Sequence, residues 1–304
     1  MDNYILLVAC FIIGMLLRRS GRLPDNAHVA LNGFVIHVSL PALTLLYVHT
    51  LRLDASLLFP VAMPWVVFAV GFVVFRFVGR LLAWPAATVG ALTLTGALGN
   101  TSFIGLPMIE TFYGRQGLGL GILIDQAGTY LVLSTVGILV AALYGQGAGV
   151  SLRAVVRKVL TFAPFLAFLA ALLLIPVTYP QWLEALLQRL GATLVPLALV
   201  SVGYQIQWSA VQGKLRLLGL GLVFKLVVAP ALIGLLFAWL LGARGEVIQI
   251  TIFEAAMAPQ IGAAIVAVDH DLDPQLVTLM VGIGIPLSFL TLPLWWHALK
   301  LLGA

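Results

Sequence analysis

Charged residues are scarce in this chain of 304 residues. Lys, Arg, Asp and Glu together make up 9% of the residues, whereas hydrophobic residues make up 62%. A soluble domain usually carries about 25% charged residues, so this chain has too few to cover a surface exposed to water. The sequence therefore excludes a soluble enzyme and an intrinsically disordered protein.

Cysteine is almost absent as well, because Cys10 is the only one. It lies within an apolar run, which excludes a disulfide-stabilised scaffold. The His, Cys and carboxylate residues nowhere show the spacing of a zinc site. The segment from Gly99 to Gly105 lacks the Gly-Lys-Ser/Thr sequence of a nucleotide-binding loop. We therefore expect no cofactor, no metal and no enzymatic activity.

Long apolar runs fill the chain instead. A helix that spans a membrane needs about 20 predominantly apolar residues, and the runs bounded by charged or turn residues predict ten spans. The predicted spans cover residues 3–17, 29–49, 56–75, 86–109, 117–144, 159–177, 182–208, 217–241, 247–268 and 275–299. The sequence thus predicts an all-α membrane protein of ten transmembrane helices, surrounded by membrane lipid.

Basic residues in the connections predict the orientation of these spans. The connections after odd-numbered spans hold ten of them, namely Arg18, Arg19, Arg22, Arg76, Arg80, Arg153, Arg157, Lys158, Lys214 and Arg216. The opposite side holds four, namely Arg52, Arg115, Arg244 and Lys300. Because Lys and Arg are more abundant on the cytoplasmic side, we expect both termini outside. The basic residues form no run, so no nucleic-acid partner is expected.

An internal repeat divides the chain. A Gly-rich connection at 145–156 separates five predicted spans in residues 1–144 from five in residues 145–304. An odd number of spans in each half gives the second half the opposite topology, which is the inverted-repeat architecture of many secondary carriers. A short match supports the division, since Leu40-Pro41 in span two corresponds to Val195-Pro196 in span seven.

Helix-breaking residues stand beside carboxamides in the middle of spans four and nine. Span four contains Gly99 and Asn100, and span nine contains Pro259 and Gln260. Gly and Pro are common in ordinary membrane helices, but here they coincide with amides at corresponding positions of the two halves. Backbone groups freed by such breaks cannot face lipid, and paired breaks of this kind indicate a carrier's binding site. The N-termini of the half-helices would suit a carboxylate.

These segments resemble the auxin efflux carrier family, which includes the plant PIN carriers and bacterial permeases for organic acids. Residues 100–107, followed by Tyr113-Gly114, resemble the family's Asn-Thr-x-x-x-Gly-x-Pro motif, and residues 254–260 resemble its second crossover segment. Further similar pieces are Asn32-Gly33-Phe34-Val35 with Leu40-Pro41, and Lys225 five residues before Pro230. The resemblance covers essentially the whole chain in order.

The chain also departs from the family pattern. Gly99 stands where the plant carriers have Pro, and Ala258 stands where bacterial relatives often have Pro. Both differences bear on the local geometry of the breaks. The long cytosolic loop of the plant proteins is absent, which argues against their type of regulation by phosphorylation, and nothing indicates auxin as the substrate.

The resemblance implies a fold similar to a sodium/proton antiporter and to the bile acid symporters, in which spans four and nine cross at their breaks. Spans one, two, six and seven would form a scaffold that makes a homodimer. Spans three to five and eight to ten would form a transport domain that moves like an elevator. The implied location is the cytoplasmic (inner) membrane of a bacterium.

Among the ionisable side chains within predicted spans, three stand out, namely Asp125, Lys225 and Glu254. Such a group costs about 2.5–3.5 kcal/mol to insert and is a functional hypothesis by default. Asp125 or Glu254, countered by Lys225, would link transport to protons if the acid takes up and releases a proton. The alternative is a permanent ion pair that only fixes the packing of helices.

Neutral polar residues and breakers at the two crossover segments are the predicted substrate contacts. They are Gly99, Asn100, Thr101, Pro259 and Gln260. Gln126 and Tyr130, which follow Asp125, either line the same cavity or hold neighbouring helices together.

The sequence thus predicts a secondary carrier of small organic anions, above all carboxylates, that works by alternating access. One alternative is a proton- or sodium-coupled cation exchanger with Asp125 as an ion ligand. Another is a membrane sensor or assembly subunit that transports nothing.

Overall fold

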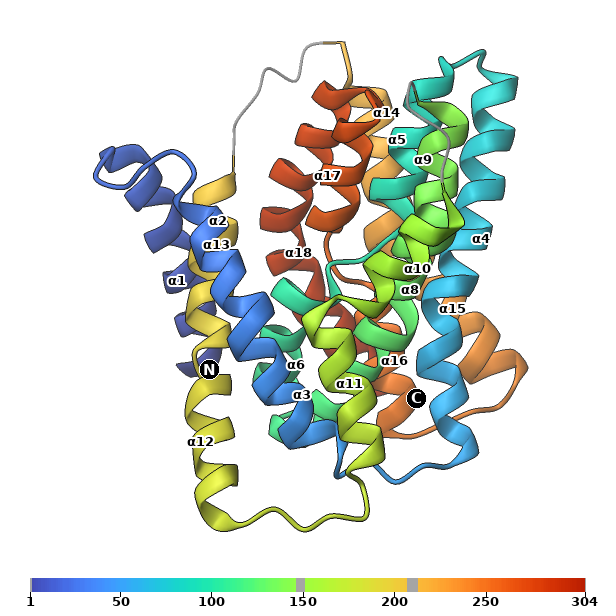
Figure 1. The fold of residues 1–304 in the computed structure, drawn as a ribbon. Helices are drawn as coiled ribbons and strands as arrows, with labels where there is room; N and C mark the ends of the chain where they lie inside the picture. The colour runs from blue at the N-terminus through green and yellow to red at the C-terminus, as the bar shows by residue number, and fades with distance from the viewer. Residues whose placement is uncertain (1, 146–150, 207–212, 304) are drawn as a thin grey trace.

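The computed structural model describes residues 2–145, 151–206 and 213–303, and Figure 1 shows them as a bundle of helices. These residues contain no β-strand. An isolated antiparallel bridge joins Gly99 to Pro259. The predicted all-α class is therefore confirmed.

Within the described residues, six helices are long and apolar enough to cross a membrane. They cover Ala27–Val48, Ala55–Leu81, Arg115–Tyr144, Gln181–Gln205, Leu215–Leu240 and Pro274–Leu301. Their elements in order are α2 (Ala27–Phe34), η1 (Val35–Ser39), α3 (Leu40–Val48), η2 (Ala55–Leu57), α4 (Leu58–Leu81), η4 (Arg115–Gly117), α7 (Leu118–Leu123), η5 (Ile124–Thr129), α8 (Tyr130–Val132), η6 (Leu133–Gly137), α9 (Ile138–Tyr144), α12 (Gln181–Gly191), α13 (Leu194–Gln205), α14 (Leu215–Val223), η7 (Phe224–Val228), α15 (Ala229–Ile233), η8 (Gly234–Leu240) and α18 (Pro274–Leu302).

Helices also lie in the four other predicted ranges. They are α1 (Asp2–Ser20), α5 (Ala86–Ala97), η3 (Thr101–Gly105), α6 (Leu106–Phe112), α10 (Leu152–Leu160), α11 (Ala163–Leu173), α16 (Glu246–Ala255) and α17 (Ile261–Asp269). Helices α10 and α11 are bent by 62° and count as a seventh span if they cross together. The predicted connection at 145–156 lies partly outside the described residues, and from Leu152 onward it is helical.

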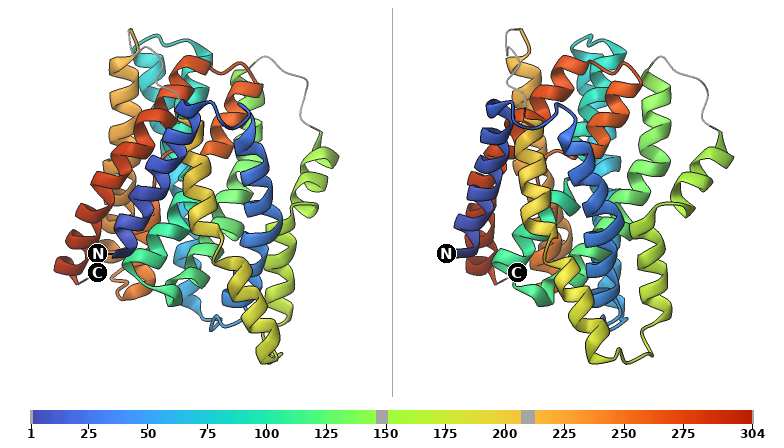
Figure 2. Two further views of the ribbon diagram at one scale, coloured as in Figure 1. Left: turned by 90° about the vertical axis from the view of Figure 1, so that its left-hand side faces the viewer. Right: turned by 60° about the vertical axis from the view of Figure 1, so that its left-hand side comes forward.

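Two groups of helices pack side by side. In the first group, α1 lies along α13, and α3 packs against α11 and α12. In the second, α4 packs on α5, α17 on α18, and α15 on α16. Figures 1 and 2 show the first group, blue for α1 and α3, yellow-green for α11 and yellow for α12 and α13, beside the second, which contains the orange and red helices.

Glycines allow the closest contact within the first group. A Cβ atom on Gly14 of α1 would overlap the carbonyl oxygen of Val200, and one on Gly203 of α13 would overlap that of Phe11. Small residues let the backbones of membrane helices approach in this way, so that dispersion forces hold them together.

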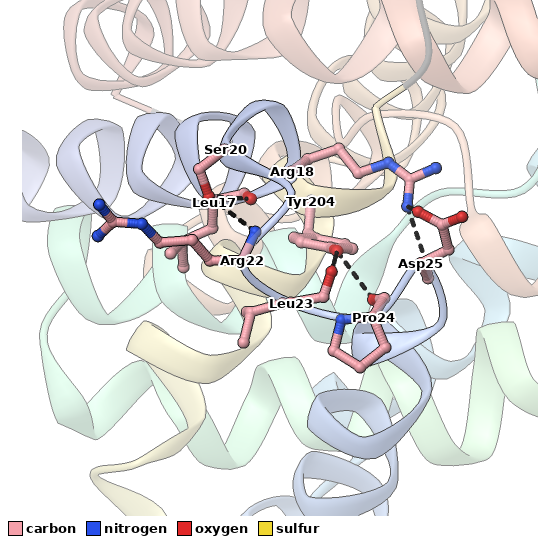
Figure 3. A network of polar contacts seen from close by, with 8 residues as sticks. All are labelled: Leu17, Arg18, Ser20, Arg22, Leu23, Pro24, Asp25 and Tyr204. Atoms are coloured by element: carbon pink, nitrogen blue, oxygen red, sulfur yellow. Dashed lines mark hydrogen bonds and ion pairs between the residues drawn. The ribbon is translucent and has the colours of Figure 1, made fainter.

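Polar contacts fix the turn that joins α1 to α2 (Figure 3). The hydroxyl of Tyr204 on α13 donates to the carbonyl oxygens of Leu23 at 3.1 Å and Pro24 at 2.9 Å. Arg18 donates to the carboxylate of Asp25 at 2.8 Å, and its guanidinium lies 5.4 Å from the centre of the Tyr204 ring. The turn is thereby tied to α13.

Asp273 connects the starts of three helices in the second group. Its Oδ2 accepts hydrogen bonds from Lys214 at 2.7 Å and from Thr88 at 2.8 Å, and its Oδ1 caps α18 at the amide of Leu276. Burial raises the pKa of Asp273, but these bonds outweigh it and hold the pKa below its usual value.

Candidate functional site

The first break lies between α5 and η3. Leu98 after α5 has an extended backbone, with φ −109° and ψ 129°, which ends the helix. Asn100 then begins the next half, because its Oδ1 accepts a hydrogen bond from the amide of Phe103 at 3.1 Å. This is the N-cap role that Asn fulfils well.

The second break lies between α16 and α17. Pro259 has no N–H, and a residue that precedes proline avoids the helical conformation, so the chain cannot continue as a helix here. Gln260 is extended, with φ −75° and ψ 128°, and α17 begins after it at Ile261.

The two breaks meet each other and satisfy each other's backbone. The amide of Asn100 donates to the carbonyl oxygen of Ala258 at 2.8 Å, and the amide of Gln260 donates to that of Leu98 at 3.1 Å. Backbone groups that would be costly in a membrane are thus paired. The crossing brings together the N-terminal ends of η3 and α17 and the C-terminal ends of α5 and α16.

A cavity of about 300 Å³ lies against this crossing. Asn100 and Gln260 line it from the breaks, Asp125 from η5, and Asn32 from α2 in the first group. Its volume is at the lower end of what pockets for small ligands have. The crossing therefore forms part of the wall of a site that could hold a small molecule.

Two buried side-chain amide atoms at the crossing have no hydrogen-bond partner among the described residues. They are the Nδ2 of Asn100 and the Oε1 of Gln260. Because the cap to Phe103 engages the Oδ1 of Asn100, its Nδ2 is left as a donor. The crossing thus offers a ligand one hydrogen-bond donor and one acceptor.

Asp125 lines the cavity with both carboxyl oxygens already engaged. Thr101 donates to its Oδ1 at 2.6 Å, and Gln126 donates to its Oδ2 at 2.7 Å. Asp125 is 4% exposed and Gln126 is fully buried. Thr101 and Gln126 do not line the cavity themselves and reach it only through Asp125.

Tyr130 both lines the cavity and joins two helices. Its hydroxyl donates to the carbonyl oxygen of Lys158 at 3.0 Å, and its ring stacks on Phe162 with 4.2 Å between centroids. Tyr130 therefore ties α8 to the bend between α10 and α11.

Lys225 and Glu254 lie near the crossing but do not line the cavity. They border a separate void of about 10 Å³, together with Gly99 and Thr101. The Nζ of Lys225 donates to the carbonyl oxygen of Ala255 at 2.7 Å, at the C-terminal end of α16. A positive charge is stabilised there, because the C-terminal end of a helix carries partial negative charge.

A second cavity, of about 460 Å³, lies between α13 and the pair α17 and α18. Gln205 lines it from α13 and Thr278 from α18. Ile261, Ile265 and Asp269 line both cavities, so α17 separates them. Contact between the two helix groups is interrupted on both faces of this helix.

The structure brings most of the predicted residues to one place. Asn100, Asp125, Tyr130 and Gln260 line the cavity, while Gly99 and Pro259 form the crossing. Their roles remain predictions. Sequence reasoning did not single out Ser102, Lys158 and Asp269 as lining residues. Lys158 and Asp269 lie beside predicted connections, where charged side chains are usually exposed to solvent. Only the packing of α10 and α17 shows that they line the cavity.

No group of three or more His, Cys, Asp or Glu side chains that could hold a metal ion occurs within residues 2–145, 151–206 and 213–303. The described lining of the cavity offers hydrogen-bonding groups and the charged residues Asp125, Lys158 and Asp269.

The chain matches a known protein family and is similar to known proteins. Residues 2–296 match the family model described as membrane transport protein. The chain is similar to an uncharacterized transporter of Methanothermobacter thermautotrophicus, with 28% identity over 291 residues and 93% of each chain covered. It is also similar to an uncharacterized transporter of Methanocaldococcus jannaschii, with 22% identity over 304 residues and 97% of each chain covered.

Proposed function

The chain belongs to the membrane transport protein family, which is the auxin efflux carrier family that its sequence motifs resemble, and we propose that it is a secondary carrier of small organic anions. One observation carries the proposal. The two broken helices meet at Gly99 and Pro259, beside a cavity of about 300 Å³ that Asn100 and Gln260 line.

The chemistry of the crossing favours an anion. The N-terminal ends of η3 and α17 carry partial positive charge and free N–H groups, and the Nδ2 of Asn100 is an additional donor. The ammonium of Lys225 would lie 3.2 Å from a Cβ placed on Gly99, just behind the crossing. Asp125 opposes this charge, but its oxygens are already bonded to Thr101 and Gln126. A carboxylate at the amide groups is the ligand that these features suit best.

The proposed movement follows from the two helix groups. Helices α1 to α3 and α10 to α13 form a scaffold, and the remaining helices form a transport domain that slides past it. Ten crossings then make two inverted repeats of five, with α5/α6 and α16/α17 as the two broken spans. The two cavities between the groups support this division, because they leave the transport domain loosely packed on the scaffold around α17.

Orientation follows from the basic residues. The cavity beside the crossing reaches Lys158 and Asp269, which lie at the side with the larger number of Lys and Arg in its connections. We assign that side to the cytoplasm, so the cavity faces inward and both termini lie outside. The proposed location is the cytoplasmic membrane of a bacterium, and the proposed assembly is a homodimer formed through the scaffold.

Counterflow in proteoliposomes tests the proposal. The purified protein is reconstituted with one unlabelled carboxylate inside, and entry of the same labelled compound is followed for a panel of monocarboxylates, dicarboxylates and indole carboxylates. We expect transient accumulation of at least one of them, which protein-free liposomes do not show. If sodium ions or protons move and no panel member does, the organic-anion proposal fails in favour of cation exchange, for which Asp125 in the cavity wall would be the ligand.

A further inference from the structure

We propose that Glu254 carries the proton that is coupled to transport, and that Thr101 connects Glu254 to the cavity. This inference rests on the proposed function, which it deepens by naming the coupling ion and its site. It also chooses between the two acids that the sequence leaves open, Asp125 and Glu254.

Glu254 has the surroundings of a neutral carboxylic acid. The residue is 0% exposed, and neither of its carboxyl oxygens has a hydrogen-bond partner among the described residues. The side chain lies against Gly105 and Gly121, where a Cβ atom would stand 2.5 Å and 3.6 Å from Oε1. A carboxylate with no donor in a membrane interior is strongly disfavoured, so a proton on Glu254 fits this environment.

Asp125 has the opposite surroundings. Each of its oxygens accepts a short hydrogen bond, from Thr101 at 2.6 Å and from Gln126 at 2.7 Å. Two donors of this kind stabilise the ionised form. The geometry therefore assigns the negative charge to Asp125 and the proton to Glu254.

The charge balance of the crossing agrees with this assignment. Lys225 is 1% exposed, and its ammonium donates to the carbonyl oxygen of Ala255; no hydrogen bond or ion pair joins it to Glu254 in the described structure. A charged Lys225 and a charged Asp125 balance each other. A third charge on Glu254 would be uncompensated, whereas a neutral Glu254 leaves the buried cluster without net charge.

A route leads from Glu254 to the cavity. Glu254, Thr101 and Thr129 line the void of about 10 Å³, which is about the volume that a single water molecule needs. The hydroxyl of Thr101 donates to Asp125, and Asp125 lines the cavity. In transfer towards the cavity, the Glu254 proton moves through a water in the void to Thr101 while the Thr101 hydroxyl proton passes to Asp125, which then releases a proton to the cavity. Glu254 ends as a carboxylate beside the Lys225 ammonium, and Asp125 ends as it began.

Few other titratable groups bear on Glu254. Asp125 on η5 and Lys225 on η7 are the other charged side chains that are buried in the described structure. The neighbouring elements α7, α15 and η8 contain no titratable residue, and α4 and α18 carry theirs in their C-terminal thirds, at Arg76, Arg80, His297 and Lys300. The protonation of Glu254 is thus set mainly by the cluster at the crossing and by the charge of a bound substrate.

A bound anion couples substrate to proton through this cluster. Its negative charge at Asn100 and Gln260 makes ionisation of Glu254 more costly, so the loaded carrier keeps the proton. When the anion leaves, Glu254 can release the proton towards the cavity. The carrier would therefore move one proton with each monovalent anion, in the same direction and without net charge transfer.

Replacement of Glu254 by glutamine tests the coupling. In proteoliposomes with an alkaline interior, the wild-type protein should accumulate the anion that counterflow identifies, and internal pH should fall in step. Glu254→Gln imitates the protonated acid, so we expect counterflow to persist while accumulation driven by the pH gradient falls at least tenfold. Glu110→Gln is the matched control, because Glu110 pairs with Arg115 outside this cluster, and it should accumulate the anion like the wild type.

Two outcomes overturn the inference and leave the proposed function standing. One is wild-type counterflow with no response to a pH gradient. The other is Glu254→Gln that accumulates the anion as well as the wild type does. Thr101→Val against Thr101→Ser provides a second pair, since only serine keeps the hydroxyl, and equal pH-driven accumulation relative to counterflow in both variants contradicts the proposed route.

Infrared spectroscopy tests the proton on Glu254 without any substrate. The purified wild type at neutral pH should show the C=O band of a protonated, buried carboxyl group. Glu254→Gln should remove this band, and Asp125→Asn should retain it. A wild-type spectrum without such a band, or a band that only Asp125→Asn removes, contradicts the assignment, even if no compound of the transport panel moves.

Discussion

At the scale of single residues, Asn100 has two roles, and a different atom of its side chain fulfils each of them. Its Oδ1 begins η3 by capping the amide of Phe103, and its Nδ2 is buried without a partner among the described residues. The first role concerns the stability of the half-helix, and the second concerns a ligand. A substitution that keeps one atom's function and removes the other's can therefore test them apart.

Asn100→Ser is such a substitution. Serine is also a good N-cap, so we expect the melting temperature to stay close to that of the wild type. The amide donor is lost, and a hydrogen bond to a charged group contributes about 1.5–3 kcal/mol, so the KM for the anion should rise about tenfold or more. Asn100→Ala removes both functions and should lower the melting temperature as well. An unchanged KM in both variants would refute a role for Asn100 in binding.

Asp273 gives a prediction about stability and pH. Its pKa in the folded protein lies below its usual value of 3.8, so the charged form contributes stability that is present above that usual value and is lost as pH falls through the lower, folded pKa. Asp273→Asn should therefore lower the free energy of unfolding by about 1–2 kcal/mol at neutral pH.

The difference in melting temperature between wild type and Asp273→Asn should be constant from neutral pH down to about pH 4 and should shrink only below it. Thermal unfolding in detergent at several pH values measures this. A difference that disappears between pH 8 and pH 6, far above the usual pKa of an aspartate, would show that Asp273 is not the group responsible.

At the scale of elements, the crossing is where sequence and structure agree best. Gly99, Pro259 and the adjacent amides predict breaks in two spans, and both breaks occur, at residues 98–100 and 256–260. This succeeded because proline and an extended residue act locally, on their own turn of helix.

Other parts of the elements could not be predicted from the sequence. The apolar pattern places a connection before span six, yet α10 begins at Leu152 and is bent 62° against α11. The break itself has a local signal, because Pro164 stands in the first turn of α11 after the extended Phe162. The packing of α10 does not, since it involves contacts between elements such as the bond from Tyr130 to Lys158. For the same reason the pattern could not show that Glu254 and Asp125 have opposite hydrogen-bonding surroundings.

The contact between α1 and α13 gives a prediction at this scale. Gly14→Ala places a methyl group against the carbonyl oxygen of Val200, and backbone atoms cannot move aside as a side chain can. We expect a loss of about 1–3 kcal/mol, typical of overpacking, seen as a lower melting temperature. Gly219→Ala on α14 is the matched control, because nothing lies within 4 Å of its Cβ position. Equal melting temperatures for the two variants would contradict the close packing of α1 on α13.

At the scale of the whole molecule, two cavities on either side of α17 separate the helix groups over part of their boundary. Packed interiors have few voids larger than a water molecule, so volumes of about 300 and 460 Å³ mark a boundary that is not closed. The proposed sliding of one group past the other would occur along this boundary.

A cross-link across the larger cavity tests that movement. Gln205→Cys on α13 and Thr278→Cys on α18 place two thiols on opposite walls, in a background where the buried Cys10 is replaced by alanine. A short bifunctional reagent should then reduce counterflow at least tenfold, and its reductive cleavage should restore it. The pair Ala264→Cys and Thr278→Cys lies within the proposed transport domain, so its cross-link should leave transport close to normal. Full transport by the Gln205→Cys/Thr278→Cys double variant after quantitative cross-linking would exclude sliding at this boundary.

The most direct measurement is the affinity of the purified protein for the anion that counterflow identifies, compared among variants of the crossing. Asn100→Ala and Gln260→Ala should each raise the Kd about tenfold, which corresponds to about 1.4 kcal/mol. Gln188→Ala removes an amide that is exposed on α12 and should leave the Kd unchanged. A Kd that stays at the wild-type value in both crossing variants would contradict the claim that the organic anion binds where the two broken helices meet.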